Sequence, residues 1–155
     1  MASGKKKKYS KRLIIGWREW VTLPEFGGLQ MKAKIDSGAR TSSLHAFHIR
    51  EMLIDGAPWV SFDIHPFQNN RHHAHACLAQ VIDRRKVRSS NGKQEMRYVI
   101  ESTLSLGGDS WPVEITLANR DEMGFRLLLG RTALRKRFLI HCGRSYLVSV
   151  PPASH

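Results

Sequence analysis

Paired turn residues divide this chain into short segments with strand-like sequences. The strongest signal is Asn91-Gly92, because this dipeptide favours the positive φ angles of a tight β-hairpin turn. It separates residues 77–87 from residues 96–106, and both segments are predicted to be strands. Gly27-Gly28 and residues 107–110 mark two further turns. Turns at such short intervals restrict the chain to a fold of short strands and leave little room for long helices.

The segments between these turns have the period of strands. Residues 29–36 alternate apolar and polar side chains, which predicts a strand with one buried face that runs into a turn at residues 37–39. The section between residues 43 and 77 is less regular. Further strands are predicted at residues 13–21, 111–118, 138–142 and 146–150, and a short helix at residues 132–136. The predicted fold class is mostly β, with about eight short strands in a small closed or partly open β-barrel and one short helix near the C-terminus.

Length and composition fit one globular domain. A chain of 155 residues can bury a core without disulfides, and its 41% apolar and 25% charged residues exclude a disordered chain. We expect a flexible basic tail at residues 1–12, a folded domain at residues 13–150 and a second tail at residues 151–155. The sequence has no apolar run of membrane-spanning length and no export signal. Since two cysteines are too few for a disulfide framework, we expect a cytoplasmic protein.

The charge of the chain is strongly positive and unevenly distributed. The 25 basic and 13 acidic residues give a formal net charge of +12. Residues 1–12 contain six of the basic residues and no acid. Such a run can bind RNA or ribosomes through counterion release, or it can act as a solvated tail, and both interpretations stay open. The arginines inside the domain are more informative, because folded elements hold them in fixed positions.

Asp36 is the candidate for chemistry. It follows a predicted strand and precedes Ser37-Gly38-Ala39, so its carboxylate lies at a turn where backbone amides can hold it. The glycine leaves space for a close neighbour. Since Asp-Ser-Gly also occurs in ordinary turns, these residues alone leave a structural and a functional interpretation open.

The order of the segments resembles the retropepsin fold of aspartic proteases. Residues 34–39 are followed by the Asn91-Gly92 hairpin and then by Leu128-Leu129-Gly130-Arg131. More specifically, the chain resembles the RimK-associated family of retropepsin-like peptidases, which are often labelled ATP-dependent zinc proteases. The resemblance covers about residues 13–148, and its matching stretches are residues 15–19, 33–43, 87–92, 97–100 and 117–134.

The resemblance implies a role for each matching residue. Asp36 would be the catalytic acid, and a flap carrying Asn91 and Gly92 would close over it. The chain has one Asp-Ser-Gly, and the Asp109-Ser110-Trp111 segment lacks the glycine, so a homodimer would supply the second carboxylate. The residues expected to form or support the catalytic loop are Ser37, Gly38, Ala39, Leu129 and Gly130.

Charge indicates the substrate class. Retropepsins commonly have an acid after the Asp-Ser/Thr-Gly-Ala motif, whereas this chain has Arg40. Guanidinium groups bind carboxylates in pairs of hydrogen bonds, so the site would favour acidic peptides. Relatives in the family accompany ATP-grasp ligases that add glutamates to protein C-termini, which implies trimming of glutamate tails on a ribosomal protein. The predicted substrate-binding residues are Arg40, Thr41, Arg88, Ser90, Arg97 and Arg131. For any single arginine, a surface charge or an ion pair with Asp121 or Glu122 is the alternative.

The sequence also offers candidates for a metal site and for non-catalytic functions. A metal could bind the cluster of His65, His72, His73, His75 and Cys77, but its spacing matches no standard site, so we interpret these histidines as solvated loop residues. We expect no metal and no cofactor, since the sequence has no phosphate-binding glycine loop either. The alternative functions are a basic barrel that binds RNA or ribosomes, using Trp17, Trp20 and Tyr98, and an inactive enzyme that binds acidic peptides.

Overall fold

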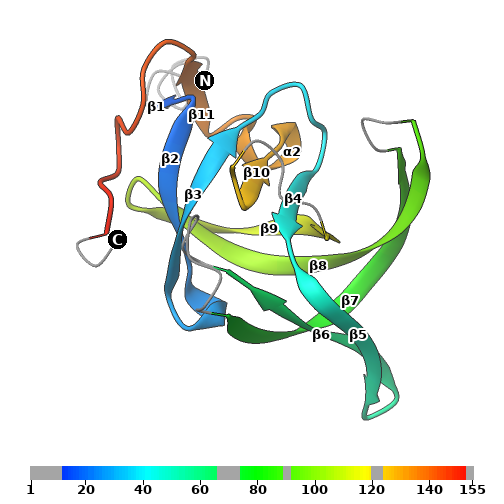
Figure 1. Cartoon of the computed structure of the whole chain (residues 1–155). Coiled ribbons are helices and arrows are strands. Elements are labelled where there is room, and N and C mark those ends of the chain that lie inside the picture. The colour runs from blue at the N-terminus through cyan, green and yellow to red at the C-terminus, as the bar shows by residue number, and fades with distance from the viewer. Residues whose placement is uncertain (1–11, 66–73, 89–91, 120–123, 153–155) are drawn as a thin grey trace, which may run out of the picture.

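Strands dominate the structure of the chain. Figure 1 shows the computed structural model, which describes residues 12–65, 74–88, 92–119 and 124–152. The elements in chain order are β1 (Leu13–Gly16), β2 (Arg18–Leu23), η1 (Pro24–Phe26), β3 (Leu29–Ile35), β4 (Ser42–His45), β5 (Phe47–Ile54), β6 (Ala57–Ile64), β7 (His75–Arg88), β8 (Gln94–Leu106), β9 (Asp109–Ala118), β10 (Leu127–Leu129), α2 (Arg131–Leu134) and β11 (Phe138–His141). The predicted mostly β fold is confirmed. None of the described helices is long and apolar enough to span a membrane.

Six strands close into a barrel. They follow the order β2-β3-β10-β4-β9-β8, and β2 returns to β8 through the pairing of Thr22 with Ser105. The predicted small barrel is therefore confirmed in its closed form. Alternate residues of each strand face the interior, as Met31, Ala33 and Ile35 of β3 do. This alternation buries a continuous apolar core.

Three strands extend the sheet beyond the barrel. Beyond β8 the sheet continues with β7, then β6, and ends at β5. These three strands lie below and beside the barrel in Figure 1. The sequence analysis found no strand between residues 43 and 77, yet β4, β5 and β6 lie there. β5 gives no clear signal because it is an edge strand whose residues are all half-buried or exposed. The described residues contain eleven strands in all, more than the eight predicted.

The predicted hairpin is confirmed in its two strands. β7 and β8 pair antiparallel from Val81 with Ile100 to Arg88 with Gln94. Gly92 has a φ of 83°, in the left-handed region that glycine favours. Ser90 and Asn91 lie outside the described residues, as do residues 1–11 of the predicted basic tail.

Some predicted boundaries are wrong. Residues 13–21 are two strands rather than one, because β1 leaves the barrel to pair in parallel with β11. The turn at residues 107–110 is confined to Gly107-Gly108, since β9 already begins at Asp109. The helix α2 begins and ends earlier than residues 132–136.

Residues 146–150, predicted as a strand, have no regular secondary structure. They lie against β2, where the side chain of Glu19 is fully buried. Glu19 accepts hydrogen bonds from the backbone amides of Leu147 and Val148 and from the hydroxyl of Ser149. The buried carboxylate thus accepts hydrogen bonds from this segment that a partner strand would otherwise accept.

Candidate active site

The carboxylate of Asp36 is held by its own turn. Asp36 directly follows β3, and its amide donates to the carbonyl of Leu129 at 2.8 Å. The amide of Ala39 donates to the carbonyl of Asp36 at 3.2 Å, which closes a four-residue β-turn. The amide of Gly38 donates to Oδ1 of Asp36 at 3.1 Å. Backbone geometry therefore fixes the direction of this carboxylate.

The segment after β10 supports the turn from the other side. β10 runs parallel to β3 and pairs Leu129 with Ile35. The amide of Gly130 donates to Oγ of Ser42 at 3.1 Å, and the amide of Arg131 donates to the carbonyl of Ala39 at 2.8 Å. A Cβ on Gly130 would lie within 2.9 Å of backbone atoms of residues 39–41. This close approach requires glycine at position 130.

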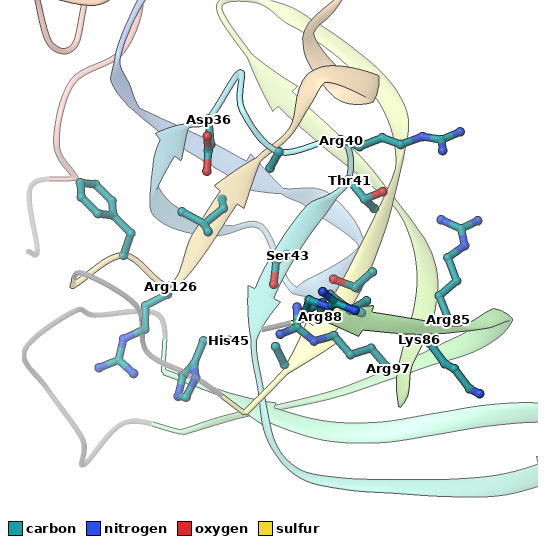
Figure 2. A pocket seen from close by; sticks show the side chains of 16 residues that line it. Asp36, Arg40, Thr41, Ser43, His45, Arg85, Lys86, Arg88, Arg97 and Arg126 are labelled. Atoms are coloured by element: carbon teal, nitrogen blue, oxygen red, sulfur yellow. The ribbon is translucent and has the colours of Figure 1, made fainter. Parts of the chain in front are cut away.

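Asp36 opens onto a cleft with a volume of about 480 Å³. Figure 2 shows Asp36 at its upper end, His45 and Arg126 at the lower left, and Arg85 and Lys86 at the right. Among the described residues that line the cleft, Asp36 is the one acid. The lining includes six lysine and arginine residues: Arg40, Arg85, Lys86, Arg88, Arg97 and Arg126.

Two of these cations are paired with acids of the same sheet. Arg85 donates to Asp83 at 2.8 Å and to Glu114 at 2.9 Å. The hydrogen bond from Arg85 lowers the pKa of Asp83, and both carboxylates raise the pKa of the Arg85 guanidinium. Arg97 donates to Glu95 at 2.7 Å. The positive charges of these two guanidinium groups are therefore partly neutralised in the absence of a ligand.

Three other cations of the cleft are exposed and make no ion pair with another described residue: Arg40, Lys86 and Arg88. Arg40 belongs to the loop that carries Asp36, whereas Lys86 and Arg88 belong to β7 of the hairpin. An anionic ligand in the cleft would therefore meet positive charge from two separate parts of the fold.

Four of the residues predicted to bind substrate line the cleft with Asp36: Arg40, Thr41, Arg88 and Arg97. Arg131 lies elsewhere, in a groove that also contains Ser37 and Ile140. Its Nη1 donates to the carbonyls of Ser37 and Gly38, both at 3.1 Å. The arginine thus contacts the loop rather than the cleft.

Sequence reasoning missed several residues of the lining: Ser43, His45, Arg85, Lys86 and Arg126. The charged run at residues 83–88, next to the predicted hairpin, was a usable signal for Arg85 and Lys86. No local pattern marks Arg126. It reaches the cleft because its carbonyl accepts the amide of His45, which aligns the start of β10 with β4.

The histidines weighed as metal ligands do not assemble in the described residues, where no group of three or more potential ligand side chains comes together. His72 and His73 lie outside these residues. Cys77 is buried in β7, and this burial, with a smaller effect of Asp63, raises the pKa of its thiol to about 12. Such a thiol is protonated at neutral pH, and metals bind the thiolate.

Comparisons with known proteins give a family match and named relatives. The family model described as retropepsin-like aspartic endopeptidase RimB matches residues 14–151. Proteins of Shewanella pealeana and Shewanella halifaxensis, both named probable alpha-L-glutamate ligase, are 50% and 51% identical to this chain over 135 residues. The match covers 87% of this chain and 30% of each relative, so the chain spans about a third of their length.

A solved structure shares the fold. The crystal structure of a Legionella pneumophila protein of unknown function superposes with a TM-score of 0.75 at 25% sequence identity. The match covers 88% of this chain and 98% of that protein. The family match over most of the chain, the closed barrel and the Asp36 turn lead to one conclusion: this chain belongs to the RimB-like family of retropepsin-like aspartic endopeptidases.

Proposed function

We propose that this chain is an aspartic-type peptidase that cleaves acidic peptides. The observation that carries the proposal is the position of Asp36, a carboxylate fixed by its own turn at one end of a cleft whose other charges are positive. The family match supports the reaction class. The charge of the cleft supports the substrate class, because carboxylates of a peptide would find charge-assisted hydrogen bonds there.

The active enzyme in this proposal is a homodimer. Aspartic proteases use two carboxylates that share one proton, and the chain has one Asp-Ser-Gly turn. Exposed apolar side chains on the outer pair of strands support the dimer: Leu13 and Ile14 of β1 and Leu139 and Ile140 of β11. Ile140 also lines the groove that contains Ser37. Of these residues, Ile140 thus lies close to the catalytic loop, where a second copy would bring its own Asp36.

The two carboxyl groups have different roles in the reaction. The ionised one accepts a proton from water as the water oxygen attacks the scissile carbonyl carbon, and the protonated one donates to the carbonyl oxygen. Breakdown of the tetrahedral intermediate transfers a proton to the leaving amine and breaks the C–N bond. The products are one carboxylic acid and one amine, and the pair of carboxyl groups again holds one proton.

Glutamate tails are the acidic substrate that we infer. The relatives named probable alpha-L-glutamate ligase match this chain over only part of their length, so a ligase and this domain occur in one protein. A ligase that adds glutamates produces the substrate that a basic cleft would accept. In our proposal this chain removes such glutamates, with a ribosomal protein as their carrier.

The test is direct. The purified protein and an Asp36→Asn variant are incubated with a protein that bears a glutamate tail, and product masses are followed across pH with and without a chelator. We expect loss of glutamates with the parent protein only, unaffected by the chelator. Absence of cleavage by the parent would reject the peptidase, and cleavage that the chelator stops would reject the aspartic mechanism.

The cleft arginines that make no ion pair with another described residue, Arg40 and Arg88, predict a preference for acidic over neutral peptides. Replacing Arg40 or Arg88 with Gln is expected to lower kcat/KM for a glutamate-rich peptide by about ten-fold each, since each change removes one charge-assisted contact. Cleavage of a matched neutral peptide should change little. Arg50, an exposed residue of β5 outside the cleft, provides the control Arg50→Gln. Equal losses on both peptides would show that these arginines do not recognise acidic side chains.

A further inference from the structure

One peptide group connects Arg131 to the carboxylate of Asp36. The carbonyl of Ser37 and the amide of Gly38 belong to the same peptide, the central peptide of the turn at residues 36–39. Its N–H donates to Oδ1 of Asp36 at 3.1 Å. Its C=O accepts from Nη1 of Arg131, also at 3.1 Å. The guanidinium and the carboxylate thus hold opposite ends of one dipole.

This peptide has a second orientation available to it. The two commonest β-turn types differ by a rotation of the central peptide through about 180°, and the rotated type requires a positive φ at the third residue. The third residue here is Gly38, which adopts a positive φ without steric cost, although its φ in this structure lies outside that region. Rotation would turn the Ser37 carbonyl toward the carboxylate and remove the Gly38 hydrogen bond.

We propose that Arg131 is a positioning residue that locks this peptide in the orientation that serves Asp36. Its Nη1 donates to the carbonyls of both Ser37 and Gly38, so a rotation would break a charge-assisted hydrogen bond. A cation at the carbonyl end also polarises the peptide and strengthens its N–H as a donor. The backbone amide of Arg131 donates to the carbonyl of Ala39, which ties the arginine to the same loop.

This role differs from the substrate contact that the sequence predicted for Arg131. The guanidinium lies in the groove with Ser37, Leu134 and Ile140, and it is absent from the lining of the cleft. Both hydrogen bonds described for its side chain are made to the loop. Arg131 therefore acts on the substrate through the turn, whereas Arg40 and Arg88 face the cleft directly.

The kinetic test rests on the proposed peptidase function. In Arg131→Ala, kcat is expected to fall about ten- to hundred-fold while KM stays within about two-fold, because a misplaced catalytic group affects the transition state more than binding. Millimolar methylguanidinium should restore part of the kcat of this variant, and Arg50→Ala is the matched control. A raised KM at unchanged kcat would instead establish Arg131 as a substrate-binding residue, and an unchanged kcat would overturn the proposal.

A second test does not depend on activity. In ¹H–¹⁵N spectra of the protein, the amide proton of Gly38 should move upfield and exchange faster with solvent in Arg131→Ala, because its hydrogen bond to Asp36 weakens. The spectrum of Arg50→Ala should keep this resonance in place. If the parent protein cleaves no peptide but the Gly38 resonance shifts, the proposed function fails and the role of Arg131 stands. A Gly38 resonance that does not move overturns the role of Arg131, whatever the activity.

Discussion

Asp36→Asn is expected to lower peptidase activity by about 10³-fold, the scale of a lost general acid–base group. An amide cannot accept a proton from water, so the attack on the scissile carbonyl loses its base. The fold should survive, because Oδ1 of asparagine can still accept the Gly38 amide that Oδ1 of Asp36 accepts. The rate of glutamate release and the thermal unfolding curve measure the two effects. Substantial residual activity in this variant would exclude Asp36 as the catalytic carboxylate.

Mixing this variant with the parent protein tests the dimer. If each active site takes one Asp36 from each protomer, a mixed dimer holds one carboxylate and is inactive. With random exchange at equal amounts, about half of the parent protomers enter mixed dimers, so activity per parent protomer should fall to about one half. A ninefold excess of the variant should reduce it to about one tenth. A monomeric enzyme would show no loss at either ratio.

The same variant separates the peptidase from the non-catalytic alternatives. A barrel that binds RNA or acidic peptides through its arginines does not need the base, so Asp36→Asn should leave such binding nearly intact. Removing a negative charge from a basic cleft should even favour an anionic ligand slightly. Binding that persists in the variant while cleavage stops would assign the arginines to recognition and Asp36 to chemistry.

The sequence predicted those parts of the fold that are determined by particular residues at local turns. The β7–β8 hairpin is marked by Gly92, whose φ of 83° favours glycine, and the turn after β3 is marked by Asp-Ser-Gly, whose residues are common in turns. β5 and β6 are also joined by such a turn, since Asp55 and Gly56 have φ angles of 51° and 79°, but β5 itself gives a weak strand signal. Neither face of β5 is fully buried, so its sequence lacks the alternation of a half-buried strand, and its conformation is decided by pairing with β6.

The candidate site, like the fold, could be predicted from the sequence only where a local pattern marks its residues. Arg40 could be predicted because it adjoins the motif in sequence. Arg126 could not, since it reaches the cleft through the packing of β10 between β3 and β4. Arg131 also adjoins a recognised motif, yet its guanidinium turns to the loop carbonyls. Sequence proximity to a motif therefore identified Arg40 and Arg131 as site candidates, whereas tertiary contacts determine what each arginine binds.

Glu19→Gln is expected to destabilise the protein by about 2–3 kcal/mol, because buried donors would lose a charged acceptor. Oε2 of Glu19 accepts the amides of Gly16 at 2.7 Å and Leu147 at 2.8 Å. Oε1 accepts the Ser149 hydroxyl at 2.6 Å and the Val148 amide at 3.3 Å. Each oxygen thus faces two donors, so in either orientation the glutamine NH₂ group would point at donors.

Chemical denaturation of Glu19→Gln, with Glu101→Gln as the control, measures this effect. Glu101 is exposed on β8 opposite Glu114, so its replacement should change the free energy of unfolding by less than about 0.5 kcal/mol. Glu19→Ala removes all four acceptor contacts and should cost more than the glutamine variant. The residues after β11 have no strand partner in the described structure. The carboxylate of Glu19 holds them to β2 together with two further hydrogen bonds, from the Tyr146 amide to the carbonyl of Arg18 and from the Trp20 amide to Oγ of Ser149. If Glu19→Gln were as stable as the parent, other contacts, such as the stacking of Arg18 on Tyr146, would have to hold this segment.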